Sequence, residues 1–131
     1  MTHAARNLLV ACLILSGLAH AKAEANTSKP YAKCLDKVGG VTNAMQECVK
    51  EELQRQDSRL GSAYKARMDS VSEKRQPQLR DAQRKWIAFQ DVNCKFYYDP
   101  QGGSAARITA NECVVTLTAD RAHELETLKG E

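Results

Sequence analysis

Cysteines carry the most reactive side chains in this chain of 131 residues. Cys34, Cys48, Cys94 and Cys113 follow the apolar amino terminus, and Cys12 lies within it. Thiols can act as nucleophiles, bind metal or form disulfides, and the redox compartment decides among these uses. No two of the four later cysteines are close enough in sequence to resemble the C-x-x-C pairs of zinc sites. We therefore expect no metal and no other cofactor.

The first 21 residues have the pattern of a secretory signal peptide. Arg6 supplies a positive charge, and a short apolar core follows at 8–15 and 17–19. Ala19-His20-Ala21 is a small-x-small cleavage site. About a dozen apolar residues are too few to span a bilayer core of roughly 30 Å. We expect cleavage after Ala21 and a periplasmic or secreted protein.

A lipid anchor is the alternative to soluble export. Leu9-Val10-Ala11-Cys12 resembles the lipobox of bacterial lipoproteins, and lipidation of Cys12 would attach the protein to a membrane. A lipobox normally closes the apolar run, whereas Leu13-Ile14-Leu15 continues it. Soluble export is therefore favoured over a lipoprotein or an uncleaved anchor, and membrane contact is expected only if Cys12 is lipidated.

Removal of residues 1–21 leaves 110 residues, which is one small domain. We expect a disordered polar leader at 22–29 and the domain at 30–131. The remaining 18 basic and 16 acidic residues give a net charge near +2, which argues against nucleic acid as a partner. Four cysteines in an exported domain predict two disulfides. Short loops favour Cys34 with Cys48 and Cys94 with Cys113, each contributing about 3 kcal/mol to stability.

The remaining reactive side chains do not form a catalytic site. His123 is the one histidine after the signal peptide, and it lies among acidic residues on an expected helix. Glu51-Glu52 and Glu124-x-Glu126 point to different sides of a helix, so neither pair supplies an acid and a base for one bond. We conclude that the protein is not an enzyme.

Hydrophobic periodicity predicts helices along the whole domain. A short turn or helix at 30–38 carries Cys34 and is broken by Gly39-Gly40. A helix of about thirty residues follows, capped by Asn43 with Gln46 or by Thr42. Its apolar stripe, which Gln56 interrupts, consists of Met45, Val49, Leu53, Leu60, Tyr64, Met68 and Val71. Pro77 breaks the pattern near 75–76, so the next helix is expected to be its antiparallel neighbour.

The stretch from Leu79 to Cys94 predicts the second long helix, with one face towards the core. That face consists of Leu79, Ala82, Trp86, Phe89 and Asn93. Turn residues at 99–103 end the helix near 96–99, and Ser104 is expected to cap a third helix that ends at Gly130. The stripe of the third helix is Ala110, Cys113, Val114, Leu117, Arg121, Leu125 and Leu128. The predicted fold is all-α: a small disulfide-stapled bundle with a long antiparallel helical hairpin and a third helix.

Several of these residues occur in an order that resembles the LprI-like lysozyme-inhibitor family, formerly a domain of unknown function. The matching positions are Cys48, Asp57-x-x-Leu60-x-x-x-Tyr64, Leu79-Arg80-x-Ala82-Gln83-Arg84-x-Trp86-x-x-Phe89-x-Asp91-x-x-Cys94, Gly102-Gly103-Ser104, Cys113 and Leu117-Thr118-x-x-Arg121. The resemblance covers nearly all of the mature chain and implies a small exported bacterial helical protein that inhibits lysozyme. Gln90 departs from the family, in which arginine is common at this position.

We interpret most of the motif residues as structural. Asp57 could pair with Arg84 or Arg121 across two helices and fix their register. Trp86 is expected in the core, with its indole N–H bonded to Asp91 or a backbone carbonyl. Gln83 and Tyr64 belong to the same motifs.

The leading hypothesis is an inhibitor that occludes the active-site cleft of lysozyme, whose chemistry depends on two carboxylates. The segment 95–107 follows Cys94 and offers cations, hydroxyl groups and aromatic rings. Its candidate binding residues are Lys95, Tyr97, Tyr98, Gly102, Gly103, Ser104 and Arg107. The alternatives are a structural or adaptor module of the cell envelope that uses the basic residues at 74–85, or an immunity-type protein that binds another toxin.

Overall fold

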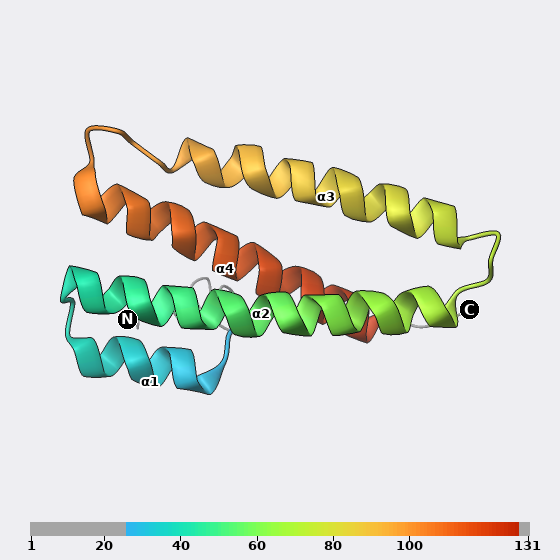
Figure 1. The fold of residues 1–131 in the computed structure, drawn as a ribbon, viewed down its shortest axis with the longest axis horizontal. Coiled ribbons are helices and arrows are strands. Elements are labelled where there is room, and N and C mark those ends of the chain that lie inside the picture. The colour runs from blue at the N-terminus through green and yellow to red at the C-terminus, as the bar shows by residue number, and fades with distance from the viewer. Residues whose placement is uncertain (1–25, 129–131) are drawn as a thin grey trace, which may run out of the picture.

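The computed structural model describes residues 26–128, which form four helices and, in this range, no strand (Figure 1). The predicted signal peptide and Gly130 lie outside the described residues. The all-α class and the helical hairpin are confirmed. The helices are α1 (Lys29–Val38), α2 (Thr42–Ser70), α3 (Gln76–Phe96) and α4 (Gly103–Thr127).

Local sequence explains the short helix α1. The Ser28 hydroxyl accepts a hydrogen bond from the backbone N–H of Tyr31 at 3.2 Å, and Pro30 occupies the first turn, where its missing N–H costs nothing. Gly39 ends the helix with φ at 55°, a left-handed conformation that glycine adopts most readily.

The caps predicted for α2 and α4 are wrong. Val41 precedes α2 and Gly102 precedes α4, and neither supplies a side-chain hydrogen bond to its helix. The positive φ of Gly103 (60°) turns the chain into α4 one residue before Ser104, which therefore lies within the first turn. The break between α2 and α3 falls at 71–75, next to the predicted position, with Pro77 in the first turn of α3.

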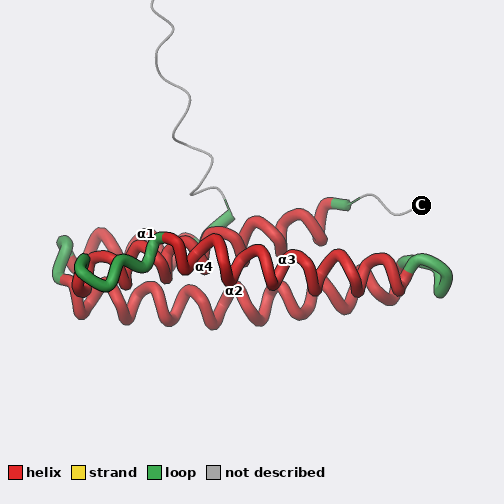
Figure 2. The backbone as a smooth tube through the Cα atoms, turned by 90° about the horizontal axis from the view of Figure 1, so that it is seen from above, coloured by secondary structure: helices red, strands yellow, loops and turns green. Residues whose placement is uncertain are grey.

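Helix α4 is the centre of the bundle. It packs along α2 and also contacts α3, while α1 packs on α2 (Figures 1 and 2). The expected direct packing of α2 on α3 is wrong, although the two helices do run antiparallel. Ala119 and Ala122 are fully buried, and their small side chains let a neighbouring helix approach α4 closely.

Two disulfides fasten the outer helices α1 and α3 to the packed pair α2 and α4. Cys34 is bonded to Cys48 and Cys94 to Cys113, as predicted, so α1 is tied to α2 and α3 to α4. Tyr31, Val49 and Val115 pack around the first disulfide in the apolar core. Each outer helix, α1 and α3, thus gains a covalent attachment in addition to its packing.

The predicted core face of α3 is wrong in part. Phe89 is 51% exposed and Ala82 is exposed, while Trp86 is only half-buried. The side that faces α4 instead carries Gln83, Gln90 and Cys94, which bond to α4. The α4-facing side is therefore rotated around the helix relative to the apolar stripe, because specific polar bonds and a disulfide orient α3.

The predicted pairing of Asp57 is also wrong. Arg84 bonds to Asp81 in its own helix, and Arg121 bonds to Gln83 and Glu124. Asp57 is exposed on α2, and partial desolvation raises the pKa of its carboxyl group. The ion pair that does join two helices connects Arg59 of α2 to Glu126 of α4 at 2.6 Å.

A buried glutamate holds the segment before α1 against α2. Glu52 has an exposed fraction of 0%. Its carboxylate accepts hydrogen bonds from the backbone N–H and hydroxyl of Ser28, from Arg55 Nε and from Gln56 Nε2, at 2.5–2.8 Å. Asn26 adds bonds to Asp120 and Arg59. The expectation of disorder is therefore wrong for 26–29, and 22–25 lie outside the described residues.

Stability should depend on pH through Glu52. Burial by itself raises the pKa of this carboxyl, but the bonds from Ser28, Gln56 and Arg55 outweigh burial and lower the pKa below its ordinary value of 4.5. These bonds therefore stabilise fully above that value, and the stabilisation is lost as pH falls through the folded-state pKa.

We expect the free energy of unfolding to fall more steeply between pH 5 and pH 3 in the wild type than in Glu52→Gln, as measured by urea denaturation. The other titrating groups are common to both proteins and cancel in the difference. Equal slopes would contradict a lowered pKa at Glu52.

Candidate functional site

An exposed aromatic cluster, which consists of Phe96, Tyr97 and Tyr98, lies where α3 ends. Phe96 is 85% exposed and forms an edge-to-face contact with Tyr97, with ring centroids 5.6 Å apart. Tyr98 is also exposed. Large aromatic side chains on a surface are characteristic of protein-binding sites. Phe96 was not among the predicted binding residues, because it closes an amphipathic helix and reads as part of its apolar pattern.

The chain that follows, residues 97–102, is the α3–α4 connection. Asp99 holds it in a tight turn, accepting bonds from the backbone N–H groups of Gln101 at 2.8 Å and Gly102 at 2.9 Å. A Cβ atom at Gly102 would lie 2.7 Å from the Ala106 Cβ, so this position requires glycine. The Cys94–Cys113 disulfide joins the two helices behind the connection. The aromatic cluster is therefore presented on a braced turn.

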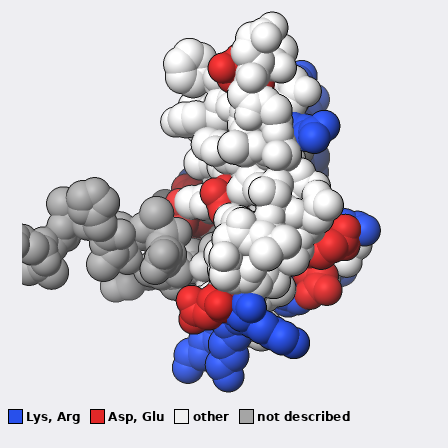
Figure 3. Space-filling view, turned by 90° about the vertical axis from the view of Figure 1, so that its left-hand side faces the viewer, with Lys and Arg blue, Asp and Glu red and all other residues white. Residues whose placement is uncertain are grey.

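The predicted cations lie on either side of this connection. Lys95 is exposed on α3 and forms an ion pair with Asp91 at 2.7 Å. Such an exposed pair is weak and can be exchanged for a partner's carboxylate at little cost. Arg107 is exposed one turn into α4, with Ser104 half-buried before it. Of the described surface at this end, the part around the connection is mostly uncharged, while lysines and arginines gather near α1 (Figure 3).

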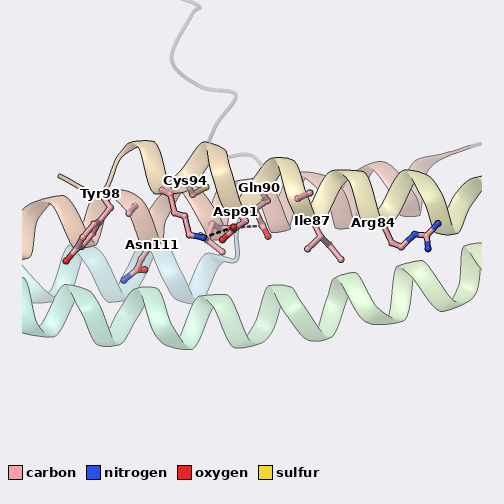
Figure 4. Close-up of a pocket in the computed structure, with 11 residues that line it drawn as sticks. Arg84, Ile87, Gln90, Asp91, Cys94, Tyr98 and Asn111 are labelled. Atoms are coloured by element: carbon pink, nitrogen blue, oxygen red, sulfur yellow. Dashed lines mark hydrogen bonds and ion pairs between the residues drawn. The ribbon is translucent and has the colours of Figure 1, made fainter. Parts of the chain in front are cut away.

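A groove runs beside the aromatic cluster between α3 and α4. Its volume is about 650 Å³. Figure 4 shows one wall of the groove, from Tyr98 in the α3–α4 connection through Asp91 and Ile87 to Arg84 on α3, with Asn111 contributed by α4. The groove thus connects the predicted segment to the Leu79–Cys94 motif. Its lining residues are Arg84, Ile87, Ala88, Gln90, Asp91, Cys94, Lys95, Tyr98, Ala110, Asn111 and Val114.

Gln90 is one of the residues that line this groove. Its side-chain amide donates to the Thr118 hydroxyl at 2.8 Å and to the Val114 carbonyl at 3.3 Å. Asn93 adds a bond to the Cys113 sulfur. Gln90, which departs from the family pattern, therefore joins α3 to α4 through two hydrogen bonds within the protein.

Some of the other predicted motif residues meet at one place in the structure, and others lie apart from it. Asp91 pairs with Lys95 rather than with the indole of Trp86. Gln83 accepts a bond from Arg121, which is buried and also pairs with Glu124. Tyr64 and Arg84 lie at a second hollow between α2 and α3. The structure thus brings Tyr64, Gln83 and Arg84 together, and places Asp57 and Trp86 elsewhere.

The part of the chain that the structure describes contains neither a group of side chains suited to hold a metal ion nor a helix suited to span a membrane. Residues 26–128 contain no group of three or more histidine, cysteine, aspartate or glutamate side chains arranged to hold a metal ion. No helix in this range has both the length and the apolar composition needed to cross a membrane.

Comparison with known proteins identifies the family. The chain matches the family described as lysozyme inhibitor LprI over residues 34–125. It belongs to the LprI family. The match begins at the first disulfide cysteine and ends near the end of α4, so it includes both disulfides and the groove. No curated protein and no solved structure matches the chain.

Membership in the LprI family confirms the predicted resemblance and indicates a lysozyme inhibitor. LprI is an inhibitor family rather than a family of enzymes, which is consistent with the expectation that the chain has no catalytic activity. The natural partner of such a protein is lysozyme itself.

Proposed function

We propose that this protein inhibits lysozyme by placing the α3–α4 connection and its aromatic cluster in the substrate cleft of the enzyme. The observation that carries the proposal is the 85% exposure of Phe96 beside a disulfide-braced turn. A phenylalanine that is largely exposed gains much when a partner covers it, and the brace lowers the entropy lost on binding.

The charges around the α3–α4 connection also support its insertion into the lysozyme cleft. Lysozyme hydrolyses its substrate with two carboxylates in the cleft, so cations on an inserted segment are attracted to it. Lys95 and Arg107 flank the connection on its two helices. The groove beside them, with Tyr98 and Asn111 on its walls, would receive a side chain from the rim of the enzyme.

We expect Phe96→Ala and Tyr98→Ala each to raise the inhibition constant roughly thirty-fold, which is the effect of losing about 2 kcal/mol at a binding hot spot. Lys95→Ala, Ser104→Ala and Arg107→Ala should each raise it by a smaller factor of roughly three to ten. The measurement is a lysozyme turbidity assay with purified, oxidised protein and several lysozyme types.

Phe89→Ala is the matched control, because Phe89 is an exposed phenylalanine of the same helix, two turns before Phe96. Its inhibition constant should stay within about twofold of the wild type. Failure of the wild type to inhibit any lysozyme at micromolar concentration would refute the function. Equal losses in Phe89→Ala and Phe96→Ala would move the binding surface away from the connection.

Export forms part of the proposal. We infer that residues 1–21 direct the chain out of the cytoplasm and are removed after Ala21, since a lysozyme inhibitor must meet its target outside. A mature protein that begins at Lys22, measured by intact mass in the periplasmic or culture fraction, supports this. A protein lipidated at Cys12 would support the lipoprotein alternative instead.

A further inference from the structure

A second hollow lies between α2 and α3, close to the turn that joins them. Its volume is about 390 Å³. It exists because α3 leans on α4 and makes few contacts with α2, so the two arms of the hairpin are not packed together (Figure 1). Its lining residues are Tyr64, Pro77, Arg80, Gln83, Arg84 and Ile87.

The polar groups of this hollow are mainly hydrogen-bond donors. Arg80 and Arg84 each bring a guanidinium group, one helical turn apart on α3. Tyr64 brings a hydroxyl group from α2. The amide oxygen of Gln83 accepts a bond from Arg121 Nε at 3.0 Å, and its NH₂ group is a further donor beside the hollow.

These donors are only lightly engaged within the described residues. Arg80 forms no ion pair or hydrogen bond in the part of the chain that the structure describes, which covers 26–128. Arg84 holds Asp81 at 3.3 Å with a side chain that is 77% exposed, a pair of little stability. No carboxylate lines the hollow, while Pro77 and Ile87 give it apolar walls.

Packing does not explain why Tyr64, Arg80 and Arg84 meet at this place, whereas Gln83 also has a structural role through its bond to Arg121. Tyr64, Arg80, Gln83 and Arg84 all belong to the motifs through which the chain resembles the LprI family. None of the four is buried, and Arg80 and Arg84 are exposed. Residues that only maintain a fold are mostly buried, whereas exposed charged and aromatic residues that converge on a hollow are typical of a binding site.

We propose that the α2–α3 hollow binds a carboxylate attached to an apolar group. A carboxylate supplies acceptors alone and therefore complements a lining of donors, and a guanidinium can hold its two oxygens with two parallel bonds. The apolar neighbour of the carboxylate would lie against Ile87 and Pro77. The hollow shares Arg84 and Ile87 with the far end of the α3–α4 groove, but it lies away from the aromatic cluster at the other end of α3. The carboxylate site does not depend on the proposed inhibition.

The test uses N-acetyl-phenylalanine as the probe and its neutral amide as the control ligand, because the two differ at the carboxylate alone. In NMR titrations of the oxidised protein, the acid should shift the side-chain signals of Tyr64, Gln83, Arg80 and Arg84 with saturation in the millimolar range. The amide should bind at least tenfold more weakly. Equal binding of acid and amide, or no shift at these residues, would overturn the proposal.

Matched variants separate a local site from general charge. Arg84→Ala should weaken binding of the acid about tenfold, and Arg84→Lys should weaken it by a smaller factor, since lysine keeps the charge but not the paired donors. Lys85→Ala removes the same charge from the next residue, which does not line the hollow, and should change binding less than twofold. An equal loss in Lys85→Ala and Arg84→Ala would show nonspecific attraction and refute the site.

Discussion

Replacement of Glu52 by alanine should lower the free energy of unfolding by about 3 kcal/mol, among the largest effects of any single substitution in this chain. The variant removes a carboxylate that is fully buried and leaves Ser28, Gln56 and Arg55 without their acceptor. Unpaired donors in a buried site lose their hydrogen bonds without regaining those to water. The measurement is urea denaturation at pH 7, followed by circular dichroism.

Glu51→Ala is the matched control for this experiment. Glu51 precedes Glu52 in the same helix and is exposed, and it forms an ion pair with Arg55 at 3.7 Å. Its free energy of unfolding should stay within about 0.5 kcal/mol of the wild type. A Glu52→Ala variant no less stable than Glu51→Ala would show that the carboxylate is not a structural centre.

The second large effect is expected from the double variant Cys94→Ser/Cys113→Ser. Loss of this disulfide should destabilise the protein by about 3 kcal/mol through the greater freedom of the unfolded chain. It should also release α3 locally, because the substitution removes the sulfur that accepts the bond of Asn93, and only Gln83 and Gln90 then keep the side-chain hydrogen bonds to α4 recorded among the described residues. Hydrogen exchange should show loss of protection along α3 while α2 and α4 remain protected.

The double variant Cys34→Ser/Cys48→Ser is the control, since it opens a loop of comparable length elsewhere in the fold. It should destabilise the protein by a similar amount without selective loss of protection in α3. If both variants leave α3 equally protected, the helix is held by packing, and the disulfide does not position the aromatic cluster. Selective release of α3 would instead show that this disulfide positions the proposed binding segment.

The sequence predicts some features of the candidate binding site and of the buried polar contacts, but not others. The segment after Cys94 could be singled out, because turn residues, tyrosines and cations follow a cysteine there. The exposure of Phe96 could not, since an apolar residue at a helical position predicts burial unless the packing partner is known. Glu52 was overlooked for the opposite reason, because an acidic residue within a charged helix reads as solvated.

The sequence by itself determined the helices, their approximate ends, the two disulfides and the family. These features follow from local periodicity, from glycine and proline, and from the small number of possible cysteine pairings. Only the tertiary structure decided that α4, and not α3, packs along α2, and which side of α3 faces inward. The physical reason is that an amphipathic stripe specifies a buried side only approximately, whereas the bonds of Gln83, Gln90 and Cys94 to α4 select one rotation of the helix. That rotation leaves Phe89 and Phe96 exposed and opens the hollow beside Arg84.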